Sequence, residues 1–72
     1  MERVPVISKN IHSIGYDAAT ETLEIKFDSG AVFQYYSVPA NVHAELMTAP
    51  SKGSYFDYRV KNSYRYSKVT WF

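Results

Sequence analysis

The chain has no cysteine and no long apolar run. Without cysteine it can form neither a disulfide framework nor a thiolate metal site, and this composition fits a reducing compartment. No stretch approaches the roughly 20 apolar residues that a membrane span requires, and no basic start leads into an apolar segment with a small-residue cleavage site. We therefore expect a cytoplasmic domain with no membrane partner.

Residues that carry catalysis or bind metals are also scarce. The two histidines, His12 and His43, fall in different expected elements, with no nearby pair of carboxylates at ligand spacing. The three glycines form no phosphate-binding or dinucleotide fingerprint, and no serine stands in a Gly-x-Ser-x-Gly elbow. We predict no catalytic residue, no metal site, no cofactor and no enzymatic activity, and we expect both histidines at the surface.

Aromatic side chains are abundant, with 12 rings among 72 residues, seven of them tyrosine. A chain of this length forms one domain, spanning residues 1–72, and folding removes only about 60% of its surface from water. Large rings help such a small core, because each buries much area while a tyrosine hydroxyl can stay wet.

Charge is unevenly distributed along the chain. Residues 1–49 carry three basic and six acidic side chains, whereas residues 50–72 carry five basic side chains and only Asp57, interleaved with rings. Basic residues among aromatics are typical of surfaces that bind nucleic acids. A small domain that merely exposes its last lysines and arginines to solvent would show the same pattern.

Three strands are expected near residues 11–16, 21–27 and 31–36. Apolar and polar residues alternate through 22–27, which is typical of a strand with one buried face. The segment 17–20 reads as a turn, and Asp28-Ser29-Gly30 reads as a three-residue hairpin loop with Gly30 at a positive φ.

The loop length decides which rings of the third strand face inward. With a three-residue loop, Ile25 lies opposite Phe33 and Leu23 lies opposite Tyr35, which places both rings on the core side. Tyr36 then stands on the other face, available to a partner. A two-residue loop would reverse these faces, and we favour the longer loop because it gathers the largest apolar set on one side.

Helices are expected after the third strand. Val42 and Leu46 recur at helical spacing within 39–49, and Pro50 ends that helix. Ser54 and Asp57 loosely resemble a capping box, which predicts a second helix over about 54–62. Alternation over 64–69 suggests a last short strand that returns to the sheet. The predicted fold is α+β, a three-stranded antiparallel meander packed by a short helix, then a second short helix and a possible final strand.

Several segments resemble the KTSC domain family. The matching stretches are SIGYD at 13–17, TLEIKF at 22–27, VFQYYSVP at 32–39, LMTAPSKGSYF at 46–56 and YRY at 64–66, so the resemblance covers about residues 8–68. This family occurs at the C-terminus of some lysyl-tRNA synthetases and as small stand-alone bacterial proteins, which implies RNA as a ligand. Its Tyr-x-Tyr motif corresponds here to Phe33-Gln34-Tyr35, where the first hydroxyl is missing and a stacking or packing role is preserved.

Two hypotheses follow from these observations. The first is an RNA-binding module that takes a single strand or tRNA on a basic and aromatic C-terminal surface. Its candidate residues are Lys52, Arg59, Lys61, Arg65 and Lys68 for phosphates, and Tyr36, Tyr58, Tyr64 and Tyr66 for bases. The second is an interaction module without catalytic activity, in which exposed rings such as Trp71 and Phe72 bind a protein or a second copy of the chain.

Overall fold

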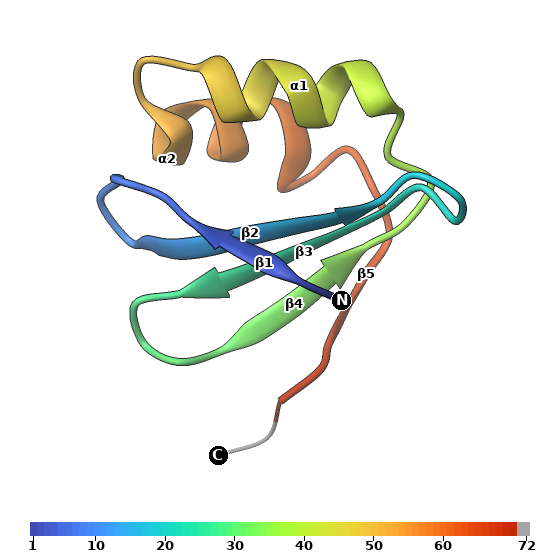
Figure 1. Ribbon diagram of the computed structural model, residues 1–72, viewed down its shortest axis with the longest axis horizontal. Coiled ribbons are helices and arrows are strands. Elements are labelled where there is room, and N and C mark those ends of the chain that lie inside the picture. The colour runs from blue at the N-terminus through green and yellow to red at the C-terminus, as the bar shows by residue number, and fades with distance from the viewer. Residues whose placement is uncertain (71–72) are drawn as a thin grey trace.

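Helices cover one face of a five-stranded antiparallel sheet in the computed structural model, which describes residues 1–70 (Figure 1). The sheet has the order β1-β2-β3-β4-β5, so the α+β class is confirmed and the final strand joins the sheet beside β4. The strands are β1 (Arg3–Pro5), β2 (Ile11–Asp17), β3 (Thr22–Phe27), β4 (Val32–Tyr35) and β5 (Tyr66–Lys68), and the helices are α1 (Ala40–Thr48), α2 (Lys52–Tyr55) and the π-helix η1 (Phe56–Val60). Trp71 and Phe72 lie outside the described residues.

The β3–β4 hairpin has the predicted three-residue loop. Gly30 adopts a φ of 96°, and the backbone N–H of Phe27 donates to the Ala31 carbonyl at 2.9 Å. Leu23 is paired with Tyr35 and Ile25 with Phe33, so the predicted register is confirmed and the two-residue alternative is wrong. This register turns the side chains of Phe33 and Tyr35 toward the helices.

The first strand, β1, was not predicted, so the expectation of three strands plus a possible fourth falls short. It has only three residues and ends in proline, and such a short segment shows no periodicity. It pairs with β2, with Arg3 opposite Gly15. A Cβ atom at Gly15 would lie 2.6 Å from the carbonyl oxygen of Glu2, so the close approach of the N-terminal segment requires glycine there.

Helix α1 packs its apolar positions against the sheet. It lies within the predicted range of 39–49, with Pro39 as the N-terminal flanking residue and with Val42 and Leu46 buried. The Tyr16 hydroxyl donates a 2.6 Å hydrogen bond to the Val38 carbonyl, which ties the start of this helix to β2.

The second helical segment begins earlier than predicted. Ser51, not Ser54, is its N-cap residue, and the Ser51 hydroxyl accepts a 3.4 Å hydrogen bond from the Ser54 N–H. The predicted capping role of Ser54 is therefore wrong. The helix widens into η1, where the Lys61 N–H donates to the Phe56 carbonyl five residues earlier. Phe56 and Val60 are buried against the core.

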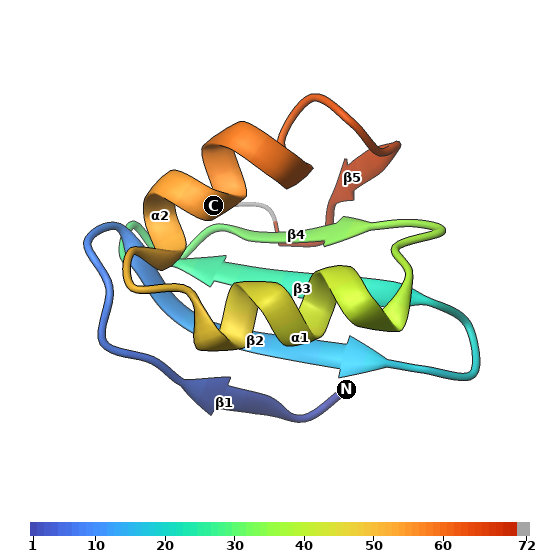
Figure 2. The ribbon, with the colours of Figure 1, turned by 90° about the horizontal axis from the view of Figure 1, so that it is seen from above.

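The two faces of the sheet differ in composition. The helix-side face carries the apolar core, including Ile14, Leu23, Ile25 and Tyr35. Seen from above, α1 runs over the middle of the sheet, while β1 and β5 form its opposite edges (Figure 2). No helix of the described chain covers the other face, which is mainly polar.

Candidate nucleic-acid interface

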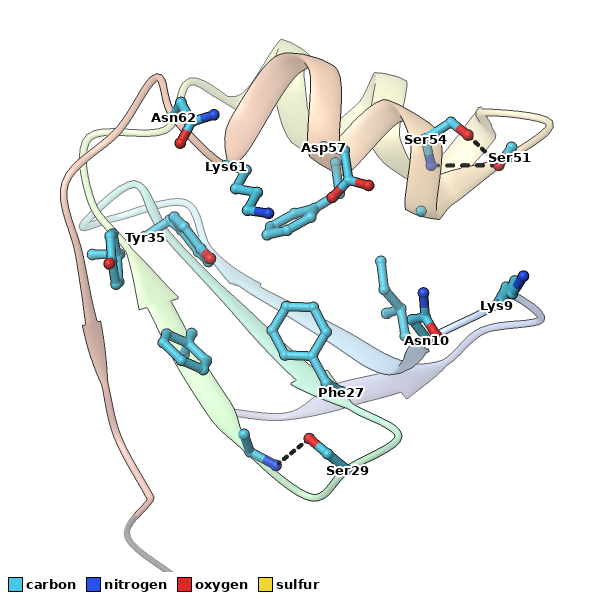
Figure 3. Close-up of a pocket in the computed structure, with 16 residues that line it drawn as sticks. Lys9, Asn10, Phe27, Ser29, Tyr35, Ser51, Ser54, Asp57, Lys61 and Asn62 are labelled. Carbon is cyan, nitrogen blue, oxygen red and sulfur yellow. Dashed lines mark hydrogen bonds between the residues drawn. The ribbon is translucent and has the colours of Figure 1, made fainter.

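A groove opens between the second helical segment and the β3, β4 and β5 part of the sheet. Its volume is about 680 Å³, and its walls come from α2, η1, the four strands β2 to β5 and the loop before β2. Figure 3 shows Asp57 of η1 and Lys61, which follows η1, above the groove, with Phe27 and Tyr35 on the sheet below. Cavities of this size accept a small molecule or one or two nucleobases.

Aromatic rings form the inner wall of the groove. They are Phe27, Phe33, Tyr35, Phe56 and Tyr66. Phe27 meets Phe56 edge to face at a centroid distance of 5.5 Å, and Tyr35 meets Phe56 in the same way at 5.4 Å. These contacts join the sheet to η1 and hold the rings in place. Tyr66 remains 58% exposed and offers the most accessible ring of the wall.

Polar and charged side chains form the rim. Lys9 and Asn10 come from the loop before β2, and Lys61 and Asn62 follow the end of η1. Asp57 is the single acidic side chain that lines the groove. A ring-lined groove with cations at its rim suits a ligand that has flat apolar surfaces and negative charges.

The Tyr35 hydroxyl is the notable polar group inside the groove. Tyr35 is only 5% exposed, and its hydroxyl points into the groove (Figure 3). Burial raises its pKa to about 12, and the neighbouring Tyr66 and Asp57 add to the shift. The group therefore stays protonated at neutral pH and can donate a hydrogen bond.

Three of the residues predicted to bind nucleic acid lie at or beside the groove. Lys61 and Tyr66 line it. Lys68 is paired with Phe33 across β4 and β5, so it shares the helix-side face of the sheet with that ring.

Four other predicted residues lie elsewhere in the helical region and around it. The Lys52 ammonium donates to the Ala49 carbonyl at 3.4 Å, and Arg59 lies beside Tyr55 near α1. Tyr64 packs on the core, and Tyr58 is 87% exposed without lining the groove.

The remaining two predicted residues do not line the groove. Tyr36 follows β4 and, by alternation from Tyr35, stands on the open face, where its hydroxyl bonds to the Ser67 hydroxyl at 2.5 Å. Arg65 accepts a backbone hydrogen bond from the Tyr36 N–H. The basic and aromatic residues of the C-terminal segment are therefore divided among several surfaces instead of forming one.

Sequence reasoning missed several groove residues. Lys9 lies in the acidic part of the chain, and Phe27 and Phe56 are not among the candidate residues named from the sequence. The Tyr-x-Tyr motif is one sequence signal for the location of this groove, because its two outer positions, Phe33 and Tyr35, both line it.

The two histidines occupy different environments. His12 is exposed, as expected, but His43 is half-buried because its ring stacks on Tyr16, with centroids 4.5 Å apart and an interplanar angle of 9°. Residues 1–70 contain no group of three or more His, Cys, Asp or Glu side chains arranged to hold a metal ion. Within the same residues, no helix has the length and apolar character needed to cross a membrane.

Comparison with known proteins places this chain in a family. Residues 7–69 match the KTSC domain. A crystal structure of a KTSC domain protein from Yersinia pestis superimposes with a TM-score of 0.93 at 40% identity, over 96% of this chain and 97% of that one.

Two kinds of protein are similar to this chain in sequence, namely small proteins of about the same length and much longer lysine–tRNA ligases. An uncharacterized protein from Stutzerimonas stutzeri is 39% identical over 96% of this chain and 99% of its own length. A lysine–tRNA ligase from Trichormus variabilis is 44% identical over 76% of this chain, which spans only 10% of the ligase. A lysine–tRNA ligase from a Nostoc species is 40% identical over 83% of this chain and 11% of its own length. The chain therefore belongs to the KTSC domain family.

Proposed function

We propose that this domain binds single-stranded RNA, with bases in the groove and phosphates on the lysines of its rim. The observation that carries the proposal is the meeting of five rings with Lys9 and Lys61 in one groove. Base stacking on aromatic rings together with a cationic path for the backbone is the usual design of proteins that bind single strands.

The relatives support an RNA ligand. Two of them are lysine–tRNA ligases that contain a segment similar to this chain. The ligase activity is not part of the proposal, because the chain matches only about a tenth of each ligase.

A chemical-shift titration of the labelled protein with tRNA and short single-stranded RNA tests the proposal. We expect the largest changes at Phe33, Lys61 and Tyr66. If Lys9, Lys61 and Lys68 each neutralise one phosphate, the slope of log K against log salt should lie near −2, from about −0.7 for each phosphate of a single strand. No shift with any RNA at low salt would overturn the proposal.

Matched variants separate the groove from the rest of the surface. Lys61→Gln should weaken binding to unrelated sequences equally and make the salt slope shallower by about 0.7, because phosphate contacts do not read the bases. Lys26→Gln removes the same charge from the open face of the sheet, since Lys26 is paired with Val32 there, and should change neither quantity.

Ring variants give a second matched comparison. Tyr66→Ala removes the most accessible ring of the groove and should cost roughly 1 to 3 kcal/mol of binding without changing the salt slope. Tyr58→Ala removes a more exposed ring that does not line the groove, and its affinity should remain that of the wild type.

A protein-binding role is the second candidate function. The N-terminal edge of the sheet exposes Val4 in β1 and Ile7 just after it, and exposed apolar side chains at a sheet edge favour contact with another chain. Such an interface should depend little on salt. Self-association lost in Val4→Ser and Ile7→Ser, with no RNA binding, would favour this candidate.

A further inference from the structure

The groove contains hydrogen-bonding capacity that the protein does not use. The Tyr35 hydroxyl is held in a side chain that is 95% buried, and it has no hydrogen-bond partner within residues 1–70. The Asp57 carboxylate, which extends from η1 into the same space, also has none among those residues (Figure 3). Asp57 is exposed and the Tyr35 hydroxyl opens into the groove, so both groups are accessible to a ligand that enters it.

The position of Asp57 determines which part of an RNA strand can enter. A carboxylate repels phosphate, whereas Lys9 and Lys61 attract it. The groove interior therefore suits an uncharged base stacked on the rings, with the phosphates held outside at the lysines.

We infer that the groove selects bases that carry an amino group, guanine first, over uracil. The inference rests on the proposed RNA-binding function and names the ligand preference of that same site. Its basis is the arrangement of one carboxylate, one protonated tyrosine hydroxyl and a wall of rings around a space of about 680 Å³.

Donor patterns of the four bases explain the order. The Watson–Crick edge of guanine presents two adjacent donors, a ring N–H and an amino group, which match the two oxygens of the Asp57 carboxylate. Adenine and cytosine each present one amino group. Uracil presents a single ring N–H between two carbonyl oxygens, and these oxygens meet the carboxylate unfavourably.

Tyr35 complements this preference. Its hydroxyl remains a donor at neutral pH and can bond to a carbonyl oxygen or a ring nitrogen of the stacked base. The hydroxyl therefore adds affinity for several bases, while Asp57 distinguishes among them.

The test uses four five-nucleotide RNAs, each with four uridines around a central G, A, C or U. Dissociation constants are measured by chemical-shift titration of the full chain. We expect the central G to bind about tenfold more tightly than the central U, within the range for one bidentate base contact, with A and C between them.

Asp57→Asn should reduce the preference for G over U to within about twofold, because the amide offers one acceptor and one donor in place of two acceptors. Glu21→Gln removes a carboxylate from the β2–β3 turn, at the opposite end of β3 from the groove loop, and should keep the tenfold preference. Tyr35→Phe keeps the ring and should weaken all four RNAs by a similar factor of roughly three to ten.

Each outcome bears on a different conclusion. Equal binding of the four RNAs, or an unchanged preference in a folded Asp57→Asn variant, overturns the base preference and leaves the RNA-binding proposal standing. If no RNA binds, or if the groove signals shift only on self-association, both fail.

Discussion

The two faces of the sheet use their polar groups in opposite ways, and the adjacent residues Tyr35 and Tyr36 show the contrast. The Tyr36 hydroxyl on the open face bonds to Ser67 and lies 3.4 Å from the Gln34 amide oxygen. The Tyr35 hydroxyl on the helix-side face opens into a groove and has no partner within residues 1–70. The Tyr36 hydroxyl is therefore bonded within the protein, whereas the Tyr35 hydroxyl is not.

A chain of side-chain contacts extends the open-face network across the sheet. The Gln34 amide donates to Glu24 at 2.9 Å, and Arg3 pairs with the same carboxylate from β1 at 2.5 Å. Glu24 is only 5% exposed, and a carboxylate so little exposed is stable only when it is paired. Polar side chains on the open face thus bond to one another, while the helix-side face near β4 keeps a groove beneath an incomplete helical cover.

The largest expected effect comes from removing the ring of Tyr35. Tyr35→Ala should lower the free energy of unfolding by about 3 kcal/mol, because this ring packs on Phe56 and fills the core below the helices. Urea unfolding measures the loss. Tyr58→Ala, a highly exposed control, should stay within about 0.5 kcal/mol of the wild type. A folded Tyr35→Ala protein with an unchanged midpoint would contradict the assigned packing.

A smaller effect is expected from disturbing the open face at Gly15. Gly15→Ala should lower the free energy of unfolding by about 2 kcal/mol. The added Cβ would lie 2.6 Å from the Glu2 carbonyl oxygen, and relieving this clash would move Arg3 away from Glu24. Unfolding of the variant beside Arg3→Ala tests this mechanism. The double variant should cost less than the sum of the two single changes, since both break the same ion pair. Additive costs would show that Gly15 acts independently of Arg3.

Removing one hydroxyl on each face compares the two faces directly. Tyr36→Phe should lower the free energy of unfolding by about 1 kcal/mol, because the Ser67 hydroxyl loses its hydrogen bond to Tyr36. Tyr35→Phe should change the free energy of unfolding by less than about 0.5 kcal/mol, because its hydroxyl has no protein partner to lose. Thermal and urea unfolding of the two variants measures the difference. A larger loss of stability in Tyr35→Phe than in Tyr36→Phe would contradict the assignment of the two hydroxyls.

The smallest effect concerns pH and the covered end of the helix-side face, where His43 stacks on Tyr16. Burial lowers the pKa of the His43 imidazole, so the unfolded chain binds the proton more readily than the folded one. Stability should therefore decrease as the pH falls below about 6.5, the ordinary value of an unfolded histidine, until the pH is below the lowered folded pKa.

Melting temperatures between pH 8 and pH 5 measure this change. His43→Phe keeps a ring on Tyr16 but cannot bind a proton, so its melting temperature should fall less between pH 8 and pH 5 than that of the wild type. A wild-type slope retained in His43→Phe would assign the effect to other groups.

Local sequence was sufficient for the central hairpin. Alternation over Thr22–Phe27 defined a strand with one apolar face, and Gly30 supplied the positive φ of a three-residue loop. Together they placed Phe33 and Tyr35 toward the helices, because a loop of known length determines which residues are paired. The resemblance to the KTSC family was equally readable from local segments.

Local sequence was not sufficient for β1 or for the start of the second helix. Three residues ending in Pro5 have no periodicity, and their pairing depends on space left by Gly15. Ser51 and Ser54 are both suitable capping residues, and only the path of the chain after α1 selects Ser51.

The sequence by itself determined the α+β class, the meander register and the face on which each ring of the central hairpin lies, because these depend on neighbours in the chain. Only the tertiary structure decided the site. Lys9, Phe33, Phe56 and Tyr66 come from separate segments and meet because Phe56 of η1 packs on rings of β3 and β4. The same packing separates Tyr36 from the groove, since charge and aromatic content along a chain do not specify which residues share a surface.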